Sequence, residues 1–237
     1  MATADKLTTV AENVPKVYDA GLASFVNTMS DGGTNFSGMF AYFTSAYTFD
    51  EETSDSYMLY INRPNFTTIP LIDTSKGIDF SSMFACCAML TTIPQLNTSN
   101  GKDFNYMFNG CTNLTTIPLI NTSNGTSFNY MFYKCTSLTT LPQLNVSKGT
   151  SFNYMFGSST TNSCTSLTTI SFVENCIGAN ISFKYCDALS HDSLISILNG
   201  LKTVTSTRTC TLGATNLAKL TDEEKAIATQ KNWTLAS

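Results

Sequence analysis

Charged residues are scarce in this sequence of 237 residues. Asp, Glu, Lys and Arg together make up 13% of the chain, about half of their share in ordinary globular proteins. The net charge is −4 and the basic residues form no cluster, which argues against nucleic acid as a partner. No run approaches the length of apolar chain that spans a bilayer, so we expect no membrane insertion. The hydrophobic content of 42% is still sufficient for a continuous core.

Signals for routing and for catalysis are also missing. The first residues lack the basic region and apolar core of a secretory signal, and the end of the sequence carries no lipidation motif. We therefore expect neither a signal peptide nor an anchor in this chain. No Walker loop, GxGxxG, HExxH or GxSxG motif occurs. The single histidine, His191, would need a converging nucleophile and orienting group to act in catalysis. We expect no enzymatic activity.

The cysteines do not follow a metal-binding pattern. The sequence contains no CxxC pair, and the acidic stretch at residues 50–55 lacks the glycine spacing of a calcium loop. Five of the eight cysteines occupy one slot of an internal repeat, namely Cys87, Cys111, Cys135, Cys164 and Cys186. We interpret them as reduced, buried, small side chains, with paired bridges or a metal site as the open alternative. We expect no metal and no cofactor.

An internal repeat dominates what is present. The motif FxxMF begins at four phenylalanines 24 residues apart, Phe80, Phe104, Phe128 and Phe152. An earlier copy begins at Phe36 and is followed by an insertion at about residues 43–62. A degenerate copy ends near residue 186, after a five-residue insertion between Phe156 and Cys164. The sequence thus predicts about six rungs of a stacked array.

Each rung combines two periodicities. Phe104, Met107, Phe108 and Cys111 have the i, i+3, i+4, i+7 spacing of a two-turn helix. Residues 114–117 are rich in strand formers and are ended by proline, which predicts a short parallel strand. Residues 121–125 read as a turn in which Gly125 can take a positive φ. Helix, strand and turn in 24 residues make one coil of an α/β solenoid, whose rungs must stack to bury their apolar faces.

Stacking predicts columns of identical side chains. The four phenylalanines that open the motif would form a spine. Asp73, Asn97, Asn121 and Asn145 would form a polar column whose side chains satisfy backbone groups in the turn.

The two ends depart from the repeat. We predict an N-terminal helical cap at residues 1–35, the solenoid at residues 36–186 and a C-terminal α/β cap at residues 187–237. In the last segment Leu194, Ile197, Leu198 and Leu201 have helical spacing, and residues 208–217 alternate like a strand pair or a strand and turn. Thr221 and Glu224 have the spacing of a capping box, and we expect the following Trp233 to pack on the last rung.

The LxxI element, the polar Asn column and the phenylalanine spine resemble a leucine-rich repeat. The element MFxxCxxLTxxP, within residues 36–190, more closely resembles the bacterial-surface-protein (BspA-like) class. The resemblance implies an α/β leucine-rich-repeat solenoid, and a non-enzymatic extracellular protein for binding or adhesion. Members of that class usually carry export signals and wall anchors, and this sequence shows neither. The opening "ADKLTTVAENVPKVYDAG" resembles the start of proteins from phage tail and prophage structural modules.

Two surfaces remain as candidates for binding a ligand. The strand face presents a threonine column, made of Thr68, Thr92, Thr116, Thr140 and Thr169. The helix face presents Tyr106, Tyr130 and Tyr154 beside Asn105, Asn129 and Asn153. Aromatic rings beside amides suit sugar rings or a protein partner. The alternative is that tyrosines one rung apart simply cover each other.

The first functional hypothesis is a recognition or adhesion protein, displayed on a phage tail or similar particle, that binds a protein or glycan of a bacterial surface. The second is a bacterial cell-surface adhesin of the same repeat class, and the third is a structural decoration or spacer protein. The location is then a virion, or an extracellular or cell-surface site. Open solenoid ends favour a homo-oligomer or assembly into a larger particle.

Overall fold

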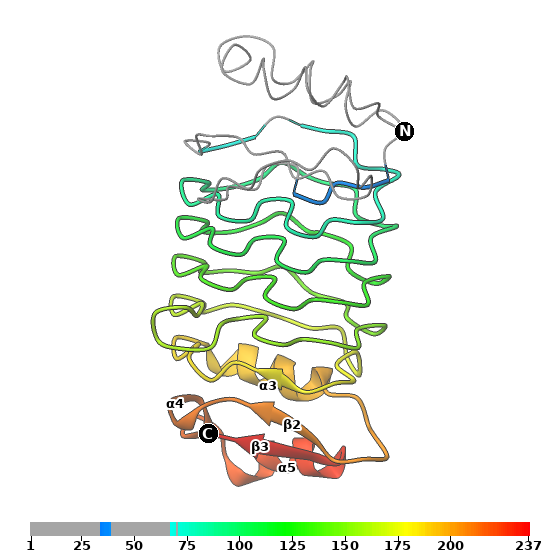
Figure 1. Ribbon diagram of the computed structural model, residues 1–237. Coiled ribbons are helices and arrows are strands. Elements are labelled where there is room, and N and C mark those ends of the chain that lie inside the picture. Colours follow the sequence, from blue (N-terminus) through cyan, green and yellow to red (C-terminus); the bar gives the residue numbers. More distant parts are fainter. Residues whose placement is uncertain (1–33, 39–66, 70) are drawn as a thin grey trace, which may run out of the picture.

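The computed structural model describes residues 34–38, 67–69 and 71–237 (Figure 1). The N-terminal cap expected at residues 1–35 lies outside these ranges except for its last two residues, and the insertion expected at 43–62 lies wholly outside them. The regular elements are β1 (Ile181–Ser182), α3 (His191–Gly200), β2 (Arg208–Thr211), α4 (Ala214–Leu217), α5 (Asp222–Gln230) and β3 (Trp233–Ala236). The strands form a small parallel sheet in the order β1-β2-β3, so the fold is mixed α/β.

Before β1 the chain winds in coils that stack on one another, with α3 and the sheet continuing the stack at one end (Figure 1). Isolated parallel bridges join residues 24 positions apart, as in Asp79 to Asp103, Asp103 to Ser127 and Ser127 to Ser151. A second line of bridges joins Thr116 to Thr140. The predicted 24-residue period is therefore also the spacing at which the backbone pairs, which indicates a repeat solenoid.

The predicted two-turn helix at residues 104–111 is wrong. This stretch is a series of turns, and Tyr106 in its middle has a φ of 58°, which a right-handed helix does not contain. The N–H of Met107 donates to the Phe104 carbonyl three residues back, at 3.3 Å. The N–H of Phe108 instead donates to Met131 in the next coil, at 2.9 Å. An eight-residue helix is only marginally stable by itself, and here the neighbouring coil supplies the acceptors.

The predicted strand at residues 114–117 is reduced to a single bridged residue, Thr116. Pro118 follows directly after Ile117 and cannot donate a backbone hydrogen bond, so the pairing cannot continue. The prediction of parallel pairing is right for this position, but its extent was overestimated.

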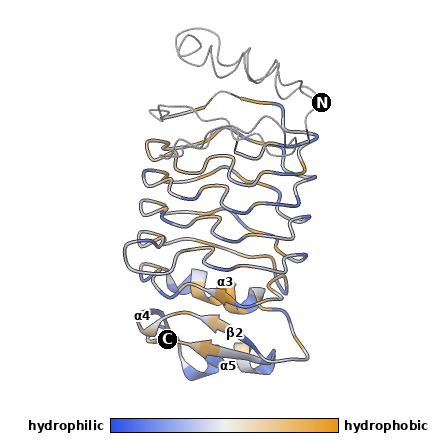
Figure 2. Cartoon of the chain, viewed as in Figure 1, coloured by the Kyte–Doolittle hydropathy of each residue, from blue (hydrophilic) through white to orange (hydrophobic). Residues whose placement is uncertain are grey.

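The predicted inward residues are confirmed. Phe104, Met107, Phe108 and Cys111 are all fully buried. The spine of Phe80, Phe104, Phe128 and Phe152 is a ladder of near-parallel rings, with centroids 5.5–5.7 Å apart. A second ladder, not predicted, runs through the other phenylalanine of the motif, Phe84, Phe108, Phe132 and Phe156. Figure 2 shows hydrophobic and hydrophilic residues alternating in short stretches around each coil.

The cysteine column is buried, as predicted. The thiol of Cys111 donates to the Phe84 carbonyl at 3.1 Å, and Cys135 donates to Phe108 in the same way. Burial raises the pKa of the Cys111 and Cys135 thiols well above the ordinary value, so both remain protonated donors at neutral pH. These cysteines therefore connect each coil to the preceding one.

The polar column has the predicted role. The side-chain oxygens of Asp73, Asn97, Asn121 and Asn145 each accept from the backbone N–H two residues later, at 2.9–3.1 Å. These side chains are mostly exposed, however, and in the first three coils the buried polar residue is the threonine that follows. Thr122, for example, donates its hydroxyl to the Asn145 carbonyl of the next coil, at 2.8 Å.

Gly125 does not use the positive φ that is open to glycine, since it is not among the residues with positive φ. The reason for glycine is space. A Cβ atom at this position would overlap the ring of Phe128 and would lie 3.0 Å from the ring of Phe104. The phenylalanine spine thus requires a residue without a side chain at this corner.

The C-terminal segment confirms several predictions. Helix α3 begins after Ser190, whose hydroxyl accepts from the Ser193 N–H, and the Thr221–Glu224 capping box is present. Trp233 is buried and donates from Nε1 to the Lys202 carbonyl at 2.8 Å, and its packing on the last rung stays a prediction. Residues 208–217 form the strand β2, a turn and the short helix α4. Of the two predicted alternatives, the strand and turn is therefore the one that agrees with the structure.

Substitution Gly125→Ala is expected to destabilise the protein by about 1–3 kcal/mol, the usual cost of overpacking a core. Urea unfolding followed by circular dichroism measures this change. Gly178→Ala is the matched control, because a Cβ there meets only Lys202 at 3.7 Å, which is ordinary contact. Equal stability of both variants would contradict the steric role of Gly125.

Candidate binding surfaces

The three predicted tyrosines lie side by side on the outside of the stack. Tyr106 and Tyr154 are 39% and 49% exposed, and Tyr130 between them is half-buried. The rings of Tyr106 and Tyr130 stack with centroids 4.7 Å apart and an angle of 5°, and Tyr154 is tilted by 40° from Tyr130. Partial burial raises the pKa of Tyr130, and the neighbouring hydroxyls add to the rise. The rings of neighbouring tyrosines therefore do cover each other.

The backbone under these tyrosines is left-handed. Tyr106, Tyr130 and Tyr154 have φ values of 58°, 56° and 52°, and Ser82 occupies the same position one coil earlier with 55°. This conformation costs an ordinary residue about 1–2 kcal/mol and is rare for bulky side chains. Glycine or asparagine would adopt it at lower cost, so packing of the turn alone does not explain tyrosine at this position.

The neighbouring asparagines connect coils. The Asn129 Oδ1 accepts from the Ser151 hydroxyl at 2.6 Å and from the Asn153 N–H at 2.8 Å. Asn105 makes the equivalent bonds to Ser127 and Asn129. The Oδ1 of Asn153 accepts no hydrogen bond from the described residues, and the Asn153 side chain is exposed. Their role in ligand binding stays a prediction, and Asn153 has the most unused hydrogen-bonding capacity.

The threonine face consists of two adjacent columns. The predicted threonines, Thr68, Thr92, Thr116, Thr140 and Thr169, are all exposed. In the threonine just before the last four of them, the hydroxyl donates to a carbonyl one coil earlier, as from Thr115 to Thr91 and from Thr139 to Thr115. The hydroxyls of the first column are therefore used for stacking, although both columns are exposed. Binding at the second column stays a prediction.

Sequence reasoning missed a groove beside the polar column, which we call the leucine–glutamine groove. It has a volume of about 1320 Å³. Its two outward-facing columns are Leu71, Gln95, Leu119 and Gln143 on one side and Asp73, Asn97, Asn121 and Asn145 on the other. Leu71 and Leu119 are 66% and 62% exposed. The available signal was the residue after each repeat proline, which alternates between leucine and glutamine.

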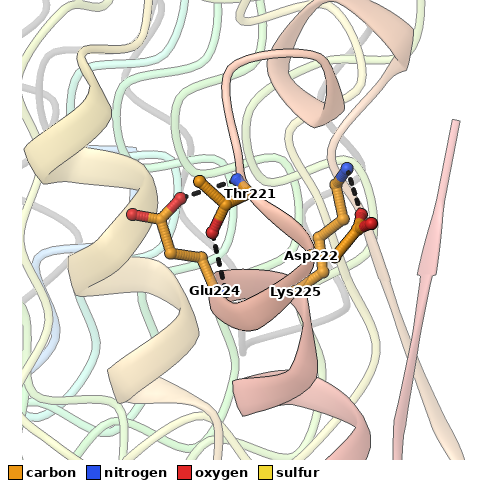
Figure 3. Close-up of polar contacts among 4 residues, drawn as sticks. All are labelled: Thr221, Asp222, Glu224 and Lys225. Atoms are coloured by element: carbon orange, nitrogen blue, oxygen red, sulfur yellow. Dashed lines mark hydrogen bonds and ion pairs between the residues drawn. The ribbon is translucent and has the colours of Figure 1, made fainter.

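His191 lies at the start of α3 and contacts α5. Its Nε2 is 2.9 Å from the Glu224 carboxylate. The other oxygen of Glu224 accepts from the Thr221 N–H at 2.8 Å, while the Thr221 hydroxyl accepts from the Glu224 N–H (Figure 3). Lys225 pairs with Asp222 on the same first turn, at 3.4 Å. Glu224 therefore joins the beginnings of two helices.

The pKa of Glu224 is lowered, chiefly by the Thr221 N–H and then by His191. A carboxylate with a lowered pKa stabilises the fold above its unfolded pKa, near 4.5, and this contribution is lost as the pH falls through the folded pKa. Glu224→Gln is therefore expected to lower the urea midpoint at pH 7, and the gap to the wild type should shrink below about pH 4.5. Glu223→Gln, one residue earlier on the same exposed turn, is the control. A gap that is constant with pH would contradict this role.

Within residues 34–38, 67–69 and 71–237, no group of three His, Cys, Asp or Glu side chains is placed to hold a metal ion. None of the helices described is long and apolar enough to cross a membrane.

A family model described as "Mycoplasma protein of unknown function, DUF285" matches residues 55–169, just under half of the chain. The match covers the most regular coils, and it agrees with the repeat architecture seen in the aromatic ladders. No curated protein and no solved structure matches the chain.

Proposed function

We propose that this chain is a non-enzymatic recognition protein, a leucine-rich-repeat solenoid of about six rungs with caps at both ends. It is displayed on a phage tail or similar particle, and it binds a protein or glycan on a bacterial surface. A cell-surface adhesin of the BspA-like class, or a structural decoration protein, is the alternative.

The observation that carries the proposal is the left-handed tyrosine column. Three bulky side chains occupy backbone positions that favour glycine or asparagine. Tyr106 and Tyr154 are nevertheless exposed, and Tyr130 is half-buried. Strained residues that the fold does not require point to function. Tyrosine is also a rigid side chain with both apolar and hydrogen-bonding parts, which binding surfaces favour because little conformational entropy is lost on contact.

The combined substitution of Tyr106, Tyr130 and Tyr154 by serine tests this role. Serine already occupies the equivalent position at Ser82, so the variant is expected to fold. Binding to intact bacterial cells should weaken by about 30-fold or more, because an aromatic hot-spot residue contributes about 2 kcal/mol. Sedimentation with cells measures this, and Tyr185→Ser, in the last coil before α3, is the control. Unchanged binding would contradict recognition through this column.

The location is tested separately from the binding surface. Under the proposal, mass spectrometry of purified phage or phage-like particles from the source culture detects the protein as a component. Recovery in the cell-wall fraction with none in particles would support the adhesin instead. These measurements test the location of the protein independently of the tyrosine variant.

A further inference from the structure

The leucine–glutamine groove is nearly free of charge. Among the described residues that line it, Asp73 is the only charged one. The others are apolar side chains, hydroxyls and amides. Apart from Asp73, a strongly acidic or basic ligand would find no counter-charge along this surface, so the chemistry of the groove favours a neutral ligand.

One side of the groove carries a row of unused donors. The Oδ1 atoms of Asn97, Asn121 and Asn145 accept from backbone N–H groups two residues later. Because a backbone N–H can only donate, the atom facing it must be oxygen, and this fixes the orientation of each amide. The three Nδ2 groups then find no acceptor within the described part of the chain. They present hydrogen-bond donors at intervals of one coil.

The other side alternates between apolar and polar. Leu71 and Leu119 are two coils apart and are the most exposed large apolar side chains of the described residues. Gln95 lies between them and donates its amide to the Leu119 carbonyl at 2.6 Å. The donors thus repeat with every coil, whereas the apolar contacts repeat with every second coil.

We propose that this groove binds a neutral, extended, β-1,4-linked polysaccharide whose sugar units lie in step with the coils. Parallel paired backbones are about 4.8 Å apart, which is close to the advance per unit of such a chain. Successive rings in a β-1,4 linkage are turned over, so the same ring face recurs at every second unit, as the leucines do. The asparagine donors meet hydroxyl and ring oxygens, and the leucines contact ring faces.

The spacing favours a polysaccharide over an extended peptide. A peptide strand places side chains of one face about 7 Å apart, which matches neither one coil nor two. The inference deepens the recognition function proposed above, on which it rests for its biological setting. It does not depend on the tyrosine column, so the two can fail separately.

Calorimetric titration of the full chain with cellohexaose and with chitin hexasaccharide tests the proposal. At least one is expected to bind, while isomaltohexaose, whose α-1,6 linkage lacks the alternation, is not. The double variant Leu71→Gln/Leu119→Gln should weaken binding by about tenfold or more, because both apolar contacts with the ring faces are lost. Met89→Gln, another exposed apolar side chain outside the groove, is the matched control.

A second variant removes the donors while leaving the turns intact. Asn97→Asp/Asn121→Asp keeps an oxygen for each backbone N–H, and Asp73 shows that the turn accepts aspartate. This variant should also weaken binding by tenfold or more, whereas the tyrosine triple variant should bind the oligosaccharide unchanged. The proposal is overturned if neither β-1,4 hexasaccharide binds, or if isomaltohexaose binds equally well. It is also overturned if both groove variants bind as the wild type does, or if the groove prefers a neutral extended peptide.

Discussion

Hydrogen bonding between adjacent coils is the interaction on which the rest of this structure depends. The described coils before β1 contain no helix, in which backbone N–H and C=O groups would pair within one segment, and no continuous strand. Amides such as those of Phe104 and Phe108 find their acceptors one coil further along the stack. A coil removed from its neighbours would leave these groups unpaired, at a cost similar to that of a lost hydrogen bond for each one buried. Each coil is therefore stable only as part of the stack.

The aromatic ladders follow from this pairing. Once the backbones are paired at a fixed spacing, identical side chains lie directly above one another. The rings of Phe104 and Phe128 are then 5.5 Å apart and nearly parallel, and they fill the space over Gly125. The same alignment positions the tyrosines, the asparagines and the groove. A surface on such a stack is a set of columns, and it suits ligands that themselves repeat or extend.

Much of the core was predictable from the sequence. The 24-residue period identified the buried face, because Phe104, Met107, Phe108 and Cys111 had to share one side of any compact coil. The capping box at Thr221 and Glu224 was predictable because it depends on residues only three positions apart. The helix at residues 104–111 was not predicted correctly, because a series of turns produces the same inward spacing as a helix. The choice between them depends on acceptors supplied by another coil.

The sequence by itself determined the period, the identity of the buried side chains and the scarcity of charge. The tertiary structure decided which atoms of the outward residues remain available for binding. Asn105 and Asn129 have their oxygens engaged by the next coil, whereas the oxygens of Asn97 and Asn121 accept from their own turn and leave the Nδ2 donors in the groove. These residues have the same chemistry and the same spacing in the sequence. The folded backbone distinguishes them, because it determines which donor lies within reach of each side-chain oxygen.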